Sequence, residues 1–444
     1  MFGIKYLTEA HLKGFDKYKY NCIDTSWFSN NVMHPFWNKC VKFFPRWLAP
    51  NLITFSGFLL TIFNFFLIAF YDYDFEAADY EKYRNEPNPI PRWVWMVAGV
   101  NLFIAYTLDG IDGKQARRTG TSSPLGELFD HGLDSYSTSI IHIYMYSLFG
   151  RVDFSPIRMH FITLMGVVNF YITHFEKYNT GVMYLPIAYD YVMCSVCLSL
   201  AFTTIIGPWI WTTKYFGILP RQFFEVLLYS SGPITSWWVT GRNIYRSYKN
   251  KTGKMRPFGE AVRPLVPLGF LCFITTVWAL FSVNKIVFDQ PRLFFVLTGT
   301  LFSNICCRLI VAQMSDTPTD RFNALLYPTA ICVAFGCFPY SSFNLTQLSL
   351  ETERWLIYLL TALVTLAHLH YGAGVVCEMC DHFKIRCFKI PDYSKFQIIV
   401  TPVQPIQHIP AAIPSVPVLE SMENQITHSK IYKRTTKIGS ILIL

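Results

Sequence analysis

The chain has 444 residues, of which 15% are charged and 52% hydrophobic, and its mean hydropathy is +0.28. A soluble domain usually carries about 25% charged residues, so much of this surface must face something other than water. The composition excludes a disordered chain and indicates a membrane protein, in which the 17% of aromatic residues would form interfacial belts.

Apolar runs of about twenty residues, the length that crosses a bilayer as a helix, recur along the chain. We expect ten such helices, near residues 52–70, 93–113, 128–149, 159–175, 189–206, 223–241, 264–282, 292–314, 322–339 and 354–375. The first 45 residues are polar and basic and lack the short apolar core of a signal peptide. The sequence therefore predicts an all-α integral membrane protein whose first span is its own insertion signal.

The net charge of +9 is distributed unevenly. The segment 1–50 is basic and the loop 71–92 is acidic, which predicts a cytosolic N-terminus and a loop on the opposite side. Counting spans then places the basic loop 242–263 and the tail 376–444 in the cytosol, with the Pro-rich part after residue 398 unstructured. The basic clusters adjoin span ends, which favours membrane lipids over nucleic acid as their partner. The sequon at Asn344 falls on the luminal side.

The twelve cysteines lie mostly singly or inside spans, as small apolar residues do, and imply no disulfide framework. Cys377, Cys380, His382 and Cys387 follow the last span and could be interpreted as a metal or redox site. Their spacing matches no standard zinc pattern, so we do not expect one.

Four aspartates mark the most informative stretch of the chain. Asp109 and Asp112 come at the end of the second span, and Asp130 and Asp134 at the start of the third. Each pair occupies one helix face, and the short connection predicts that the two helices are antiparallel neighbours. Four ionised carboxylates in apolar surroundings would cost roughly 10 kcal/mol together, so a cation must lie between them. Oxygen ligands alone select Mg²⁺, Mn²⁺ or Ca²⁺, and four carboxylates suffice for two ions that clamp a transferring phosphoryl group.

Small and basic residues accompany the aspartates. Gly110, Gly113, Ala116 and Gly126 remove side chains near the acidic faces, which lets a ligand or another helix approach the backbone. Arg117 and Arg118 offer cationic forks for phosphate oxygens.

The eight positions Asp109, Asp112, Gly113, Ala116, Arg117, Gly126, Asp130 and Asp134 form the pattern by which CDP-alcohol phosphatidyltransferases are identified, and the chain resembles that family from about residue 10 to 390. The stretches 47–54, 126–132 and 176–181 are similar to the eukaryotic choline and ethanolamine phosphotransferases. The segments 14–20 and 32–37 look most like the ethanolaminephosphotransferases of the selenoprotein I type. The tail lacks a selenocysteine, so no selenium-dependent role is expected.

The resemblance implies a transfer of phosphoethanolamine from CDP-ethanolamine to diacylglycerol, giving phosphatidylethanolamine and CMP. It also implies a catalytic bundle of the first six spans (residues 51–241), followed by C-terminal helices over 264–375. We further expect a homodimer with Mg²⁺ or Mn²⁺, in the endoplasmic reticulum or Golgi, with a site that faces the cytosol and takes diacylglycerol from the bilayer.

Two alternatives stay open. The motif does not separate ammonium from trimethylammonium, so the donor could be CDP-choline, or both donors could be used. A divalent-cation transporter is a remote second alternative, since intramembrane acids often mark ion paths. The residues 264–375 hold no second acidic cluster and Arg117 would repel a permeating cation, which disfavours transport.

Asn51 and Thr54 enter the first span one turn apart, where they could cap the helix. The resemblance favours a contact from Asn51 to the CDP moiety.

His131 is the imidazole of the acidic stretch and our candidate general base for the diacylglycerol hydroxyl. Glu127 precedes it by one helical turn, so we expect its carboxylate to hold one ring nitrogen and fix the tautomer. If His131 is instead a packing or partner residue, Asp134 is the substitute base.

Overall fold

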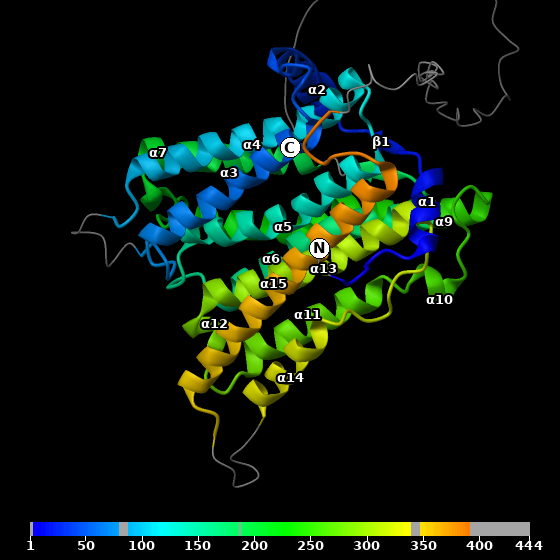
Figure 1. The fold of residues 1–444 in the computed structure, drawn as a ribbon. Helices are drawn as coiled ribbons and strands as arrows, with labels where there is room; N and C mark the ends of the chain where they lie inside the picture. The colour runs from blue at the N-terminus through cyan, green and yellow to red at the C-terminus, as the bar shows by residue number, and fades with distance from the viewer. Residues whose placement is uncertain (1–2, 80–87, 186–187, 339–346, 391–444) are drawn as a thin grey trace, which may run out of the picture. The chain divides into compact units, whose positions relative to one another are not determined.

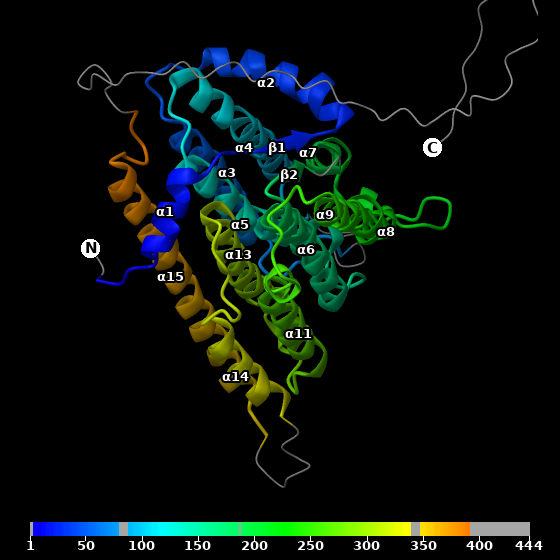
Figure 2. The same cartoon turned by 90° about the vertical axis from the view of Figure 1, so that its right-hand side faces the viewer.

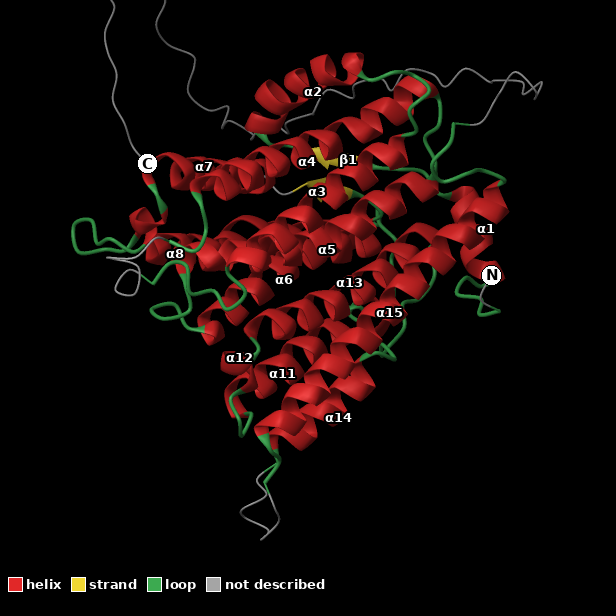
Figure 3. Ribbon diagram, turned by 60° about the vertical axis from the view of Figure 1, so that its left-hand side comes forward, coloured by secondary structure: helices red, strands yellow, loops and turns green. Residues whose placement is uncertain are grey.

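The computed structural model describes residues 3–79, 88–185, 188–338 and 347–390. Within these ranges the chain is almost entirely helical, with a single pair of short strands (Figure 3). The sequon at Asn344, the central part of the acidic loop at 71–92 and the Pro-rich tail lie outside the described residues.

The first part of the bundle consists of long helices, several of which begin with a proline. Proline is favoured at the first helical position because its missing N–H would have no partner there. The helices are α3 (Pro50–Tyr71), α4 (Arg92–Thr119), α5 (Pro124–Phe149), α6 (Pro156–Thr180), α7 (Ala188–Ile206), α8 (Pro220–Ser231) and α9 (Trp238–Asn250).

The sixth expected span is not one continuous α-helix. Between α8 and α9 the chain forms a π-helical stretch, η4 (Gly232–Trp237). Pro233 within it lacks the N–H that an α-helix requires, which explains the change of winding. In addition, α9 continues through Asn250, two turns into the segment where we expected a loop.

The remaining helices enclose a buried central member. They are α11 (Leu265–Phe281), α13 (Pro291–Ser315), α14 (Leu326–Cys337) and α15 (Leu350–Phe383), with the short α10 (Phe258–Ala261), α12 (Ile286–Asp289) and η3 (Pro208–Trp211) in the connections. α13 packs against α5, α6, α11 and α15 (Figure 2). Its side chains are nearly all buried, so α13 links the first part of the bundle to the second.

The N-terminal segment folds onto one end of the bundle. It contains α1 (Glu9–Lys17), β1 (Cys22–Asp24), η1 (Ser29–Met33), α2 (His34–Cys40) and η2 (Val41–Phe43). α1 packs on α13 and α2 packs on α4 (Figure 1). β1 pairs in parallel with β2 (Met183–Leu185), directly after α6. The backbone N–H groups of Tyr6 and Leu7 donate to Glu378 of α15 at 2.8 and 2.9 Å.

Five helices are long and apolar enough to cross a membrane: α3, α4, α13, α15 and the Tyr189–Ile206 part of α7. α11 and α14 are apolar but have only 17 and 12 residues. α5 and α6 carry the polar residues of the site described below, which lowers their hydropathy. The protein is therefore an integral membrane protein with several candidate spans, and the count of ten remains a prediction.

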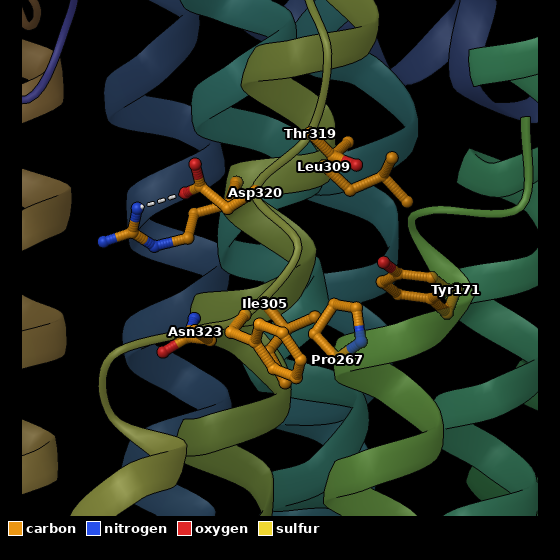
Figure 4. Close-up of a pocket in the computed structure, with 9 residues that line it drawn as sticks. Tyr171, Pro267, Ile305, Leu309, Thr319, Asp320 and Asn323 are labelled. Atoms are coloured by element: carbon orange, nitrogen blue, oxygen red, sulfur yellow. Dashed lines mark hydrogen bonds and ion pairs between the residues drawn. The ribbon is translucent and has the colours of Figure 1, made fainter. Parts of the chain in front are cut away.

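The connection from α13 to α14 is held by an ion pair. Arg308 of α13 donates to Asp320 at 2.8 Å (Figure 4). The cavity lined by Asp320, Tyr171 and Pro267 measures only about 10 Å³, which is room for one water molecule at most. None of the four motif aspartates lines it.

Candidate active site

The motif aspartates lie where α4 and α5 are joined by a tight reversal. After α4, Gly120 has φ of 68°, a left-handed conformation that glycine adopts without strain. The hydroxyl of Ser123 then accepts from the backbone N–H of Gly126 at 3.3 Å and caps α5. The last turns of α4 and the first turns of α5 therefore share one end of the bundle.

The short reversal brings α4 and α5 to one end of the bundle, as expected, but the two helices do not pack closely along their length. α3 packs along both of them, whereas α4 and α5 make few direct contacts. Close packing would press the acidic faces together without a counterion, which is unfavourable in a low dielectric. The carboxylate side chains of the two helices approach one another, while the backbones of α4 and α5 stay apart.

Three of the four carboxylates converge. Oxygen atoms of Asp109, Asp112 and Asp130 all lie within 4.8 Å of one another. Asp134 is not in this group and lies one turn further along α5, so it remains a predicted ligand.

Neighbouring groups orient two of these carboxylates. The hydroxyl of Thr54 donates to Asp112 Oδ2 at 2.5 Å, and the backbone N–H of Gly113 donates to Asp112 Oδ1. Tyr189 of α7 donates to Asp109 Oδ2 at 3.4 Å. Thr54 thus orients an acidic side chain of the cluster.

The third carboxylate shows that the cluster fits a cation. Asp130 Oδ1 is buried and has no hydrogen-bond partner in the described part of the chain. A buried, unpartnered carboxylate oxygen is costly unless a cation compensates it. Three oxygen-donor side chains without sulfur or nitrogen are the ligands that Mg²⁺ and Mn²⁺ prefer.

The small residues of the motif differ in their surroundings. A Cβ atom added at Gly113 would come within 3.6 Å of the Arg117 guanidinium, and one at Gly126 would lie 3.6 Å from Asn51 Oδ1, both ordinary contacts. A Cβ at Gly110 would overlap the ring of Trp37 on α2 at 2.2 Å. Gly110 therefore serves the packing of α2, whereas the backbone at Gly113 and Gly126 stays approachable, as expected for substrate contacts.

The two arginines also differ. Arg118 donates to the backbone carbonyls of Val41 and Phe44 at 2.8 and 2.6 Å, so it holds the end of the α2 segment rather than a phosphate. Arg117 is exposed and makes no hydrogen bond or ion pair within residues 3–79, 88–185, 188–338 and 347–390. It is thus available to an anionic ligand. Ala116, in the last turn of α4 after Asp112, is half-buried.

Asn51 lies at the start of α3, facing Gly126 of α5. Its amide donates to Cys387 Sγ at 3.6 Å. The adjacent Phe388 ring packs against Phe55 and Phe129, at 5.5 and 5.7 Å between centroids. The turn after α15 therefore borders the same end of α3 and α5. All twelve cysteines are free thiols. In the described ranges the acidic trio is the one group of His, Cys, Asp or Glu side chains close enough together to hold a metal.

The expected hydrogen bond between Glu127 and His131 is not found among the described residues, and that expectation was wrong. Tyr18 donates to both Glu127 oxygens at 2.7 and 2.8 Å, and Lys177 of α6 forms an ion pair with the same carboxylate. The Lys177 ammonium is buried and needs an anionic partner, which explains why Glu127 faces it. Burial and the Glu127 carboxylate raise the pKa of Tyr18, so its hydroxyl stays protonated as a donor.

This ion pair is expected to dominate the local stability. The side chains of Lys177 and Glu127 are only 2% and 7% exposed. Lys177→Met should lower the free energy of unfolding by about 3–5 kcal/mol, because it leaves a buried carboxylate without its cation. Denaturant unfolding in detergent measures this.

The double variant Glu127→Gln/Lys177→Met should recover most of that loss, since it buries no lone charge. Lys13→Met is the matched control, because Lys13 and its partner Glu9 are exposed and 3.7 Å apart. It should change stability by less than about 0.5 kcal/mol. A loss of equal size in Lys13→Met and Lys177→Met would contradict the assignment.

Known proteins resemble this chain over most of its length. Residues 47–220 match the sequence pattern described as CDP-alcohol phosphatidyltransferase. Ethanolaminephosphotransferase 1 of Homo sapiens is 42% identical over 393 residues, which cover 88% of this chain and 96% of that protein. Choline/ethanolaminephosphotransferase 1 of Arabidopsis thaliana is 26% identical over 408 residues, covering 87% of this chain and 98% of the relative.

The chain belongs to the CDP-alcohol phosphatidyltransferase family. The matched segment contains all eight motif positions and the whole of α3 to α7. The N-terminal strand β1, α1 and α15, which border the same end of the bundle, lie outside it.

Several residues at the site of this family member were not found by sequence reasoning. They come from distant parts of the chain: Tyr18 and Lys177 contact Glu127, His174 contacts His131, and Tyr189 contacts Asp109. A histidine or lysine on a helix carries no spacing signal by itself. Lys177 lies in the stretch 176–181 and Tyr18 in the segment 14–20, and the resemblance partly rested on both, which was the available clue.

Proposed function

We propose that this chain is an ethanolaminephosphotransferase, which transfers phosphoethanolamine from CDP-ethanolamine to diacylglycerol and releases phosphatidylethanolamine and CMP. The observation that carries the proposal is the 42% identity to human ethanolaminephosphotransferase 1 over 96% of that protein. The convergence of Asp109, Asp112 and Asp130 supplies the chemistry that the reaction needs.

Asp109, Asp112, Asp130 and Asp134 would hold Mg²⁺ or Mn²⁺, as two ions. When bound, such ions supply positive charge opposite the diphosphate and the departing CMP. The exposed guanidinium of Arg117 adds a positive charge next to the aspartates. The backbone at Gly113 and Gly126, which carries no side chain, leaves room for CDP-ethanolamine.

His131 acts as the general base. The diacylglycerol hydroxyl attacks the phosphorus that carries ethanolamine, its proton passes to the His131 ring, and the bond from that phosphorus to the CMP oxygen breaks. Asp134 is the alternative base. Glu127 holds Tyr18 and Lys177 beside the base instead of contacting its ring.

The acceptor is a lipid, so it enters sideways from the bilayer. Large apolar side chains point outward from α3 and α15, among them Phe66, Phe70, Leu359 and Leu366, as a lipid-facing surface requires. Basic residues cluster around the site end of the bundle, where Lys254 and Arg256 pair with Asp316. This supports a site that faces the cytosol, and ten is the number of spans that we propose. Residence in the endoplasmic reticulum or Golgi and a homodimer follow from the resemblance.

Purified protein in lipid nanodiscs, supplied with diacylglycerol and Mg²⁺ or Mn²⁺, tests the activity. We expect phosphatidylethanolamine from CDP-ethanolamine, with kcat/KM at least about tenfold above that for CDP-choline. Equal rates would assign dual specificity, as the name of the Arabidopsis relative states for that protein. Divalent-ion flux into liposomes without any CDP-dependent lipid product would instead support a transporter.

Asn51 is proposed to contact the nucleotide. Its amide is engaged only by a weakly accepting thiol, Cys387 at 3.6 Å, so a better acceptor can replace that contact. Asn51→Ala should raise the KM for CDP-ethanolamine about tenfold, the cost of roughly one hydrogen bond to a charged group, and leave the KM for diacylglycerol nearly unchanged. Steady-state kinetics with each substrate varied in turn measures this. An unaltered donor KM in a folded variant would assign Asn51 to helix capping.

A further inference from the structure

His174 of α6 is a buried histidine that none of the roles above uses. It is 2% exposed, and its ring meets that of His131 edge to face, with 5.2 Å between centroids and an interplanar angle of 76°. His131 has no hydrogen bond to another side chain in the described ranges, and Glu127 is engaged elsewhere. The edge-to-face contact with His174 therefore restrains the orientation of the His131 ring.

His174 is itself held from two other sides. Gln313 of α13 lies with its side-chain nitrogen 3.1 Å from His174 Nδ1, and Gln313 is only 4% exposed. The Phe170 ring lies 5.1 Å from the His174 ring, at an interplanar angle of 45°. Gln313 is a fixed partner because α13 is the buried central helix. The contacts from His131 to His174 and from His174 to Gln313 thus connect α5, α6 and α13.

Ring orientation matters for a general base. The second torsion of histidine has broad, shallow preferences, so an unrestrained imidazole samples many planes. Proton transfer requires a nitrogen within about 2.6–3.2 Å of the hydroxyl and correctly aimed. A neighbouring ring whose own position is fixed removes that freedom without occupying either nitrogen of the base.

We propose that His174, anchored by Gln313, is a positioning residue that fixes the ring plane of His131 for proton transfer from the acceptor hydroxyl. The inference rests on the proposed function of His131 as the base. His174 acts through His131 and contacts neither substrate nor the aspartates. His174 thus orients the His131 ring, a role that the sequence analysis assigned to Glu127.

If His174 had only a structural role, it would stabilise the packing of α6 against α13. Another buried histidine of α6, His160, serves as the control for such a loss of packing. His160 is also buried, with 0% exposure, and its ring meets Phe294 edge to face at 5.4 Å. It also pairs with a polar side chain, Thr276, at 3.2 Å. His160 lies 14 positions before His174 on the same helix and contacts no motif residue.

The test compares His174→Ala, His174→Phe, Gln313→Leu and His160→Ala in nanodiscs. We expect His174→Ala to lower kcat about 10- to 100-fold, as misplacement of a catalytic group does, with both KM values within about twofold. His174→Phe, which keeps a ring against His131, should restore part of kcat. Gln313→Leu should give an intermediate loss. His160→Ala should lower thermal stability as much as His174→Ala while its kcat per folded molecule stays within about twofold of the parent.

A double-mutant cycle separates this inference from the proposed function. If His174 acts through His131, then adding His174→Ala to His131→Ala should change kcat by less than about twofold. A kcat within twofold of the parent in His174→Ala, or equal kcat losses in His174→Ala and His160→Ala, would overturn the positioning role. Loss of activity in His131→Ala together with full activity in His174→Ala would leave the base assignment intact and reject only the inference. Full activity in His131→Ala would reject both, while CDP-ethanolamine turnover by the parent would still support the transferase.

Discussion

Asp130→Asn is expected to lower turnover at least about 100-fold while the protein still inserts into the membrane. The substitution removes one negative charge from three carboxylates within 4.8 Å of one another, and it alters the buried oxygen that lacks a protein partner. Insertion becomes easier because a neutral amide is cheaper to bury than a carboxylate. Asp109→Asn, Asp112→Asn and Asp134→Asn should have the same effect.

Two measurements check this expectation. Turnover is followed at saturating Mg²⁺ or Mn²⁺, and the shift in melting temperature on addition of Mn²⁺ reports binding independently of activity. Asp190→Asn is the control, since Asp190 is also a buried carboxylate near Asp109, but it accepts hydrogen bonds from Ser29 and Tyr106. It should keep the Mn²⁺-dependent shift. Full turnover in any two of the four motif variants would refute the metal assignment.

His131→Ala is expected to reduce kcat by about 10²–10⁴-fold, the usual contribution of a general base, with the donor still bound. His131 follows Asp130 in α5, but its ring contacts His174 and is not part of the carboxylate trio, so the donor and metal contacts should survive. Single-turnover kinetics and equilibrium binding of a CDP-ethanolamine analogue separate the two steps. If kcat falls less than tenfold, the base lies elsewhere, and Asp134 is the next candidate.

Each of the ten expected ranges overlaps a helix of the structure, but the sixth is divided between α8, η4 and α9, and several ends were misjudged. α4 runs six residues past the predicted end at 113, through Lys114 to Thr119. Lysine, glutamine, alanine and arginine are good helix formers, yet a search for apolar runs stops at them. α5 begins four residues before the predicted start, because its Pro124 and the Ser123 cap define the true boundary. A search for apolar runs also does not register the proline at position 233, where the helix changes its winding.

The site was predictable only where its residues follow one another in the chain. The four aspartates, Gly113 and Gly126 belong to one stretch with a specific spacing, and the structure brings Asp109, Asp112 and Asp130 together. Lys177 meets Glu127 across 50 residues of sequence, and Gln313 meets His174 across 139. Such pairs depend on which helices pack together, and a single sequence without aligned homologues carries no record of that. Glu127 was therefore paired with the nearest histidine instead of the distant lysine.

The hydrogen bond between the Tyr6 backbone and Glu378 can form only late in the synthesis of the chain. The two residues are 372 positions apart, and a ribosome adds about 5–20 residues per second, so the N-terminal segment waits roughly 20–75 s for its partner on α15. The strand pair of β1 with β2 and the contact of Tyr18 with Glu127 can form much earlier, once α5 and α6 are made. The contacts of the N-terminal segment with β2 and α5 can thus form before its contact with α15, the last helix in the described part of the chain. A chain that ends before residue 378 would contain all four aspartates but would lack the carboxylate that Tyr6 and Leu7 bind.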